Sequence, residues 1–191
     1  SYIDLDPDLT DQYMSHDYIG GPSFIIKLDA TGDYVWSRRI GFSEVSKLLV
    51  DKNNDICIAG FSVPFDASKP NVANFGDGSN FSNNKVVFRY DYNQGNILLK
   101  INSSGNFKWA TSLGTGTNVS DVVQDESGNY ILTGKWEGDV DLNPGGFKYN
   151  PRLDPKNTFK YTSGFYIKKI DLNGSFKWVQ PFYNAKLFGG G

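Results

Sequence analysis

The strongest constraint on the fold is an internal repeat, because one pattern of residues occurs three times along the 191-residue chain. Each copy begins with an apolar run that ends in Lys-apolar-Asp/Asn, has a Gly three residues after the Asp/Asn, and ends at a Trp four residues after that Gly. The copies span residues 24–36, 97–109 and 166–178, so the repeated tryptophans are Trp36, Trp109 and Trp178. Such agreement indicates a repeat architecture, in which each unit buries its apolar surface against its neighbours.

The first two copies continue in parallel beyond the tryptophan. Residues 45–51 match residues 119–125, and residues 55–60 match residues 129–134, with a constant spacing. In each copy the two segments are separated by Asn, Asp, Ser and Gly residues, which are typical of a hairpin turn. Each full copy therefore predicts four antiparallel strands.

Alternation of aromatic and apolar residues supports strands, and no segment keeps the 3.6-residue period of a helix, so we expect almost no helix. In the second strand of the second copy, alternation predicts Phe107, Trp109 and Leu113 on one face and Lys108 and Ala110 on the other. Four antiparallel strands with a repeated Trp are typical of a β-propeller blade. We expect the repeated Trp to be buried between neighbouring blades.

The fold class expected is therefore all-β, a partial β-propeller with blades of four antiparallel strands. The ranges predicted are the tail of one blade at 1–23, a blade at 24–61 with an inserted loop at 62–95, a blade at 96–136 with a loop at 137–163, and a half blade at 164–191. A closed ring of four blades would need about sixteen strands, whereas about two and a half blades are present. We expect a fragment of a larger propeller, with oligomerisation and an open stack as alternatives.

The repeated pattern resembles the SBBP-type β-propeller repeats of bacterial secreted and surface proteins. The resemblance covers about residues 24–182, and residues 140–145 (Val-Asp-Leu-Asn-Pro-Gly) are similar to the loop that follows the fourth strand of such repeats. It implies a non-catalytic module outside the cytoplasm, either extracellular or at the cell surface.

Other propeller families fit less well. Residues 28–36 also resemble the tryptophan-docking motif of pyrroloquinoline-quinone dehydrogenases, but the Thr-Gly pair is kept only in the first copy. The spacing from Gly to the aromatic residue differs from the Asp box of sialidases, and the Trp-Asp and Gly-His dipeptides of WD40 repeats are absent from the sequence.

Composition excludes several other classes of function. Nineteen Lys+Arg against twenty-one Asp+Glu give a formal charge of −2, which lacks the positive footprint of a nucleic-acid-binding protein. A single Cys excludes an intrachain disulfide and a multi-thiolate metal site. No apolar run approaches the ~20 residues that a membrane-spanning helix needs. We expect no nucleic-acid partner, no membrane insertion and no cofactor.

Two residue types that often carry chemistry occur once each in the sequence. His16, the only histidine, lies in a polar stretch without a neighbouring base or nucleophile, so we interpret it as a loop residue. Cys57 lies between Ile56 and Ile58 in a predicted strand, so we interpret it as a core residue. The sequence therefore predicts no catalytic, cofactor-binding or metal-binding residue.

Three sets of polar residues leave alternatives open. Asp4, Asp6, Asp8 and Asp11 have a spacing that suits either a structural turn or a calcium site. The repeated lysines Lys27, Lys100 and Lys169 either lie along the sheet or face a channel that binds an anion. Four asparagines, Asn80, Asn102, Asn118 and Asn173, fit the N-glycosylation sequon, which has meaning only in a eukaryotic source.

These observations favour a structural or binding module of a secreted or surface protein. We expect its partners to be other blades or domains of the same protein or assembly, and a glycan or protein surface recognised through the loops between blades. The alternatives are a fragment of a propeller enzyme (a quinoprotein-like oxidoreductase or a hydrolase) and a building block of a filament or surface layer.

Overall fold

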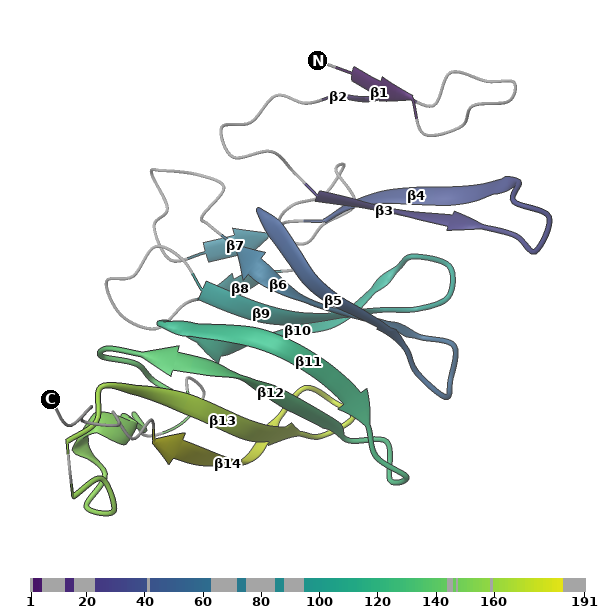
Figure 1. Ribbon diagram of the computed structural model, residues 1–191. Coiled ribbons are helices and arrows are strands. Elements are labelled where there is room, and N and C mark those ends of the chain that lie inside the picture. Colours follow the sequence, from purple (N-terminus) through teal and green to yellow (C-terminus); the bar gives the residue numbers. More distant parts are fainter. Residues whose placement is uncertain are drawn as a thin grey trace, which may run out of the picture.

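The fold consists of antiparallel β-strands stacked in layers, as Figure 1 shows. The computed structural model describes residues 2–4, 13–15, 23–40, 42–62, 72–74, 85–87, 95–143, 146, 148–158 and 160–183. Within these ranges the helical structure is a single 3-10 turn, η1 (Pro151–Leu153). The all-β prediction is therefore confirmed for the described residues.

Ten strands form three principal sheets. The first sheet pairs β3 (Ser23–Leu28) with β4 (Tyr34–Ile40). The second sheet has the order β5 (Glu44–Val50), β6 (Ile56–Ser62), β9 (Gly95–Ile101), β10 (Phe107–Gly114), and the third has the order β11 (Thr117–Gln124), β12 (Tyr130–Glu137), β13 (Ser163–Ile170), β14 (Phe176–Tyr183). Two short hairpins complete the described strands: β1 (Tyr2–Asp4) with β2 (Tyr13–Ser15), and β7 (Val72–Asn74) with β8 (Lys85–Val87). The described sheets do not close into a ring (Figure 1).

The boundaries of the sheets fall in the middle of each repeat copy. Each four-stranded sheet takes its first two strands from one copy and its last two strands from the next copy. The ranges 24–61 and 96–136, each expected to form one blade, therefore each contribute strands to two different sheets. The physical reason is that a periodic sequence has no intrinsic starting point: it predicts the order of the strands, but not which four of them pair.

In each copy a β-bulge in the second strand changes which residues point to which side of the sheet. In β10 the pairing register shifts between Phe107 and Trp109. Phe107 and Ala110 consequently pack toward the first sheet, whereas Trp109 and Leu113 pack toward the third. The prediction that Phe107 and Trp109 share a face is therefore wrong, because a bulge inserts one extra residue into the strict two-residue alternation.

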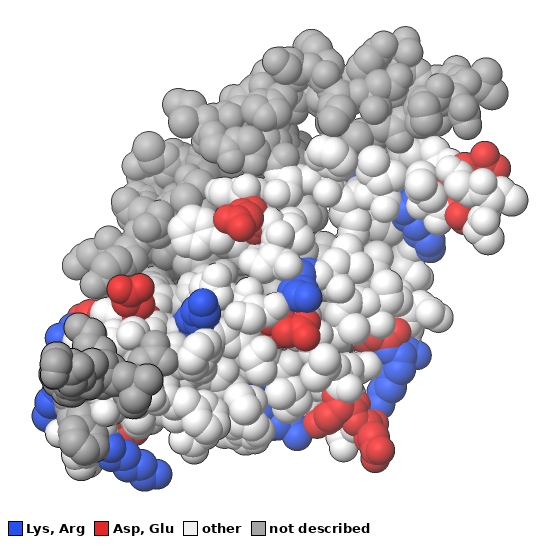
Figure 2. Space-filling model, in the orientation of Figure 1, with Lys and Arg blue, Asp and Glu red and all other residues white. Residues whose placement is uncertain are grey.

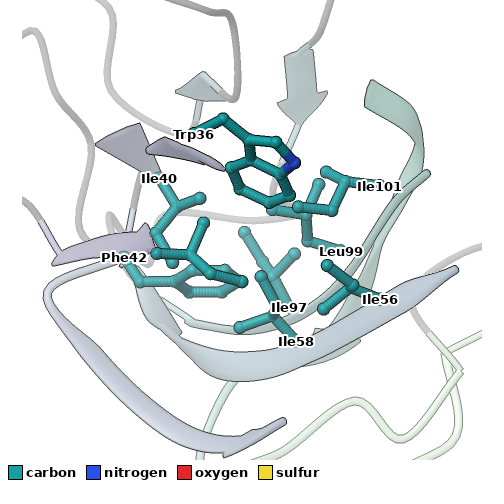
Figure 3. Packing of buried hydrophobic residues seen from close by; sticks show 9 residues of the cluster. Trp36, Ile40, Phe42, Ile56, Ile58, Ile97, Leu99 and Ile101 are labelled. Carbon is teal, nitrogen blue, oxygen red and sulfur yellow. The ribbon is translucent and has the colours of Figure 1, made fainter. Parts of the chain in front are cut away.

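Two apolar clusters hold the layers together, and a third joins the last sheet to a loop. The cluster between the first and second sheets joins Trp36, Ile40 and Phe42 to isoleucines and Leu99 of the second sheet, and Figure 3 shows the Trp36 indole lying over these side chains. A second cluster lies between the second and third sheets and includes Leu98. A third packs the end of the third sheet against the loop that precedes β13. Each fully buried aliphatic side chain contributes roughly 1.5–3 kcal/mol, so the stack depends on contacts between neighbouring sheets.

Candidate functional site

The repeated tryptophan makes the same contact with the next sheet in two places. The Trp36 indole Nε1 of the first sheet donates a hydrogen bond to the Ser103 carbonyl oxygen of the second sheet, at 3.1 Å. The Trp109 Nε1 of the second sheet donates to the Leu172 carbonyl oxygen of the third sheet, also at 3.1 Å. Ser103 and Leu172 occupy the same position of the repeat. We call this arrangement the Trp–turn contact.

The repeated glycine allows the indole ring to approach the turn. A Cβ atom added to Gly105 would lie 3.0 Å from Cγ of Arg38 and 3.2 Å from Cε3 of Trp36, and one added to Gly174 would lie 2.8 Å from Cε3 of Trp109. Both glycines also have positive φ, 80° and 85°, which other residues rarely adopt. The Gly of one copy is therefore required both by its own turn and by the Trp of the preceding copy.

The Asp or Asn that opens each turn organises its backbone. The Asp29 Oδ1 accepts hydrogen bonds from the backbone N–H groups of Thr31 and Asp33, at 2.9 and 3.0 Å. The corresponding oxygens of Asn102 and Asp171 accept the equivalent pairs of bonds. Side chains of this kind stabilise tight turns by replacing a backbone acceptor. The repeat thus preserves one turn that presents a carbonyl oxygen and a bare Gly to the preceding Trp.

The three repeated lysines do not gather at one site. Lys100 lies within 2.8 Å of Asp51 and 3.0 Å of Asp55, with 4% of its side chain exposed. Lys169 pairs with Asp125 at 2.7 Å, and Lys27 donates to the Ser103 carbonyl oxygen at 3.0 Å. Each lysine is bound by the protein itself, so its geometry gives no support to a common anion site.

A buried polar cluster surrounds Lys100. The Tyr130 hydroxyl of the third sheet donates to Asp51 Oδ2 at 2.8 Å, which links two neighbouring sheets. Burial acts to lower the pKa of Lys100, but its bonds to Asp51 and Asp55 outweigh burial and raise the pKa above its usual value. Lys108, whose side chain is 44% exposed, also binds Asp55 at 2.6 Å, so the arrangement is a structural ion-pair network that reaches the surface only at Lys108.

Cys57 lies in the interface beside this cluster, with no exposed surface. Burial raises the pKa of its thiol to about 11. Because the thiolate is the nucleophilic form, the Cys57 thiol is unreactive at neutral pH in the folded state. Its position in the described core agrees with the interpretation as a packing residue.

Lys168, which was not among the candidates predicted from the sequence, is 1% exposed in the third sheet. Its ammonium donates to the Leu113 carbonyl oxygen at 2.6 Å. Burial lowers the pKa of Lys168 to about 7, and the nearby Asp141 carboxylate opposes that effect. One signal in the sequence was available, because the same repeat position holds Ile26 and Leu99 in the other two copies.

Lys168 forms part of the wall of a cavity of about 430 Å³ between β10 and the β13–β14 hairpin. Thr111, Ser112, Ser175 and Phe176 also line it. Within the described part of the chain, Asp141 Oδ2 is buried without a hydrogen-bond partner, while Asp141 Oδ1 accepts from the Asn143 and Tyr149 N–H groups. This cavity has room and polar groups for ordered water.

Several predicted candidates lie outside the described residues. They are His16, Asp6, Asp8, Asp11 and Asn80, while Asp4 lies in β1, where only the backbone is described. Of the other sequons, Asn102 and Asn173 lie in the turns of the Trp–turn contact and Asn118 lies on β11. The calcium and glycosylation hypotheses therefore stay predictions.

Among the described residues on the face that Figure 2 shows, acidic and basic side chains are interspersed among uncharged residues. Among the described residues no group of three or more His, Cys, Asp or Glu side chains is arranged to hold a metal ion. The described residues also contain no helix with the length and apolar character needed to cross a membrane. No protein-family model matches the chain, and no curated protein matches it in sequence.

Proposed function

We propose that this chain is a non-catalytic stacking module, a structural or binding unit of a larger propeller-type protein or assembly. The observation that carries the proposal is the recurrence of the Trp–turn contact with the same donor, the same acceptor position and the same bare Gly. A contact that recurs at each interface is a general means of adding one sheet to the next.

The stacked sheets would hold the loops between strands in fixed positions. Loops on a rigid scaffold are where recognition residues most often lie, so we propose that glycan or protein surfaces are bound there. A secreted or cell-surface location is proposed from the resemblance to SBBP-type repeats alone.

Exchange of turns tests whether the contact is modular. Replacing residues 102–106 with the sequence of residues 171–175 keeps the Asp/Asn, the Gly and the carbonyl position, so we expect the free energy of unfolding to change by less than about 0.5 kcal/mol. As a matched control, Gly105→Asn keeps a residue that tolerates positive φ but places a side chain against Trp36, and it should destabilise the protein clearly.

A large loss of stability in the exchanged variant would contradict the modular contact.

A turnover screen of the purified chain addresses the non-catalytic part of the proposal. Tightly bound quinone or measurable hydrolysis would instead favour the enzyme alternative.

A further inference from the structure

The outer face of the third sheet has the same pattern as the buried face of the second. Across the second sheet, one row of paired residues runs Leu49, Cys57, Lys100, Trp109, and this row packs against the third sheet. Across the third sheet the equivalent row runs Val123, Ile131, Lys169, Trp178. The third sheet therefore carries a complete second version of a surface that the protein elsewhere covers.

In the third sheet this surface is exposed. The exposed fractions are 53% for Val123, 50% for Phe165, 44% for Trp178 and 47% for Phe182. By contrast Leu113, which occupies the repeat position of Phe182 in the second sheet, is fully buried. Among the described residues the Trp178 indole N–H has no hydrogen-bond acceptor, so the prediction that all three repeated tryptophans are buried is wrong for Trp178.

The first sheet carries the other half of the contact, and among the described residues no Trp occupies it. A Cβ atom added to Gly32 would meet nothing within 4 Å, although its φ of 95° matches the turns of the other copies. Ala30, at the repeat position of Ser103 and Leu172, is exposed. Phe24 and Leu28 are 41% and 51% exposed, whereas their counterparts Ile97 and Ile101 are buried between sheets.

We propose that a second copy of this chain docks head-to-tail, with the outer face of the third sheet of one copy against the outer face of the first sheet of the other. The Trp178 N–H donates to the Ala30 carbonyl oxygen of the second copy, and the indole ring covers Gly32. The proposal rests on the proposed function, since it extends the Trp–turn contact from inside the chain to the contact between chains. Two different surfaces meet, so the association is heterologous and propagates unless it closes into a ring.

Two variants separate the two halves of the contact. Trp178→Ala removes the donor and ring, and Gly32→Asn adds a side chain where the ring would lie while keeping a residue that tolerates positive φ. Both positions are open to solvent, so circular dichroism and thermal unfolding should show that each variant folds. Leu153→Ala, at a side chain that is 76% exposed on η1, is the matched control.

Sedimentation velocity over a range of concentrations provides the readout. We expect the wild-type chain and Leu153→Ala to form larger species as concentration rises, and each docking variant alone to need at least a tenfold higher concentration. A mixture of Trp178→Ala and Gly32→Asn should form a 1:1 complex and nothing larger, because each variant retains one intact half.

A wild-type chain that stays monomeric would overturn the proposal, and the outer faces would then belong to further repeats in a longer chain or to another protein. Gly32→Asn chains that dimerise at the same concentration as the wild-type chain would also overturn it, since the contact would then not involve the turn at Gly32. Either result would leave the turn-exchange experiment unaffected, so the proposed function and this inference fail separately.

Discussion

At the scale of single residues, position in the stack decides what a repeated residue does. Trp36 is covered by the second sheet, Trp109 is half-buried against the third, and Trp178 lies on an outer face. The three residues share a sequence pattern, so their different exposure comes from their neighbours and not from their own strands. Substitution of these three tryptophans should therefore lower the free energy of unfolding by unequal amounts.

We expect Trp36→Ala to lower the free energy of unfolding by about 3–5 kcal/mol, because it leaves a cavity between two sheets. Trp178→Ala should change it by less than about 0.5 kcal/mol, because the residue is largely solvated. Urea denaturation of both variants, at a concentration where the chain is monomeric, measures the difference. Equal losses would show that Trp178 is packed in solution.

Lys168 predicts a specific dependence of stability on pH. Its pKa is lowered from an ordinary value of 10.5 to about 7 in the folded state, so above pH 7 the unfolded chain holds a proton that the folded chain releases. The stability contributed by this residue therefore rises with pH between about 7 and 10.5 and becomes constant well below pH 7, where both states hold the proton. Between pH 7 and 8.5 the gain should be on the order of 1 kcal/mol.

Lys168→Met is the control for this effect, since Met has similar length and no titrating group. As the pH rises from 7 to 8.5, the wild-type protein should gain unfolding free energy relative to Lys168→Met. The range stops at pH 8.5 because Cys57, whose folded pKa is about 11, favours the folded state less at higher pH. A pH-independent difference would contradict the burial of a neutral lysine.

At the scale of strands and turns, the repeat predicted much of the fold. It located the first two strands of each copy and the third and fourth strands of the first two, because apolar alternation and turn residues are local signals. It missed the partition of strands into sheets, which depends on pairing between distant segments. It also missed the bulge between Phe107 and Trp109, since nothing in the alternation marks the inserted residue.

The candidate site was predictable in part. The Asp/Asn, Gly and Trp of the contact were all identified as repeated residues, but their meeting across two sheets was not. Lys168 was missed because a lysine in a strand is ordinarily interpreted as exposed, and only comparison with Ile26 and Leu99 shows that its position is apolar. Such departures from a repeat are the local signal for buried polar groups.

Lys100 and Lys169 occupy the same repeat position and pair with aspartates of the neighbouring hairpin turns, but their substitution should cost different amounts of stability. Lys100→Met would leave the Asp51 carboxylate, which is 0% exposed, without its ammonium partner, whereas Asp55 would keep its ion pair with Lys108 at 2.6 Å. We expect a loss of about 3–5 kcal/mol in unfolding free energy. Lys169→Met, whose ion pair with Asp125 is about a quarter exposed, should cost about 0–1 kcal/mol. Chemical denaturation near pH 7 gives both values, and similar losses would contradict the structural role of the Lys100 cluster.

At the scale of the whole molecule, two interfaces between the described sheets hold the stack together, and among the described residues the outer faces of the first and third sheets carry exposed apolar side chains. The interface between the second and third sheets buries Cys57, Leu98 and Leu132 completely. Separation of these sheets would expose the single thiol of the chain. Thiol reactivity therefore reports how often this interface opens.

We expect the Cys57 thiol of the native protein to react with a small disulfide reagent at pH 8 far more slowly than the thiol of the unfolded chain. Trp109→Ala should accelerate the reaction about tenfold for each 1.4 kcal/mol that the interface loses. Trp178→Ala, on an outer face, should leave the rate unchanged. Rapid labelling of the native wild type would show that the two sheets do not form a closed interface.

Because each four-stranded sheet joins one hairpin from each of two successive copies, a stretch of about one period supplies one hairpin of each kind, even when those two hairpins belong to different sheets. A tandem duplication in the gene would consequently lengthen the stack by one complete layer without needing its breakpoints to coincide with a sheet boundary. Proteins of this design can change their number of layers in single genetic steps, and each new layer inherits both the indole and the glycine that join it to the next.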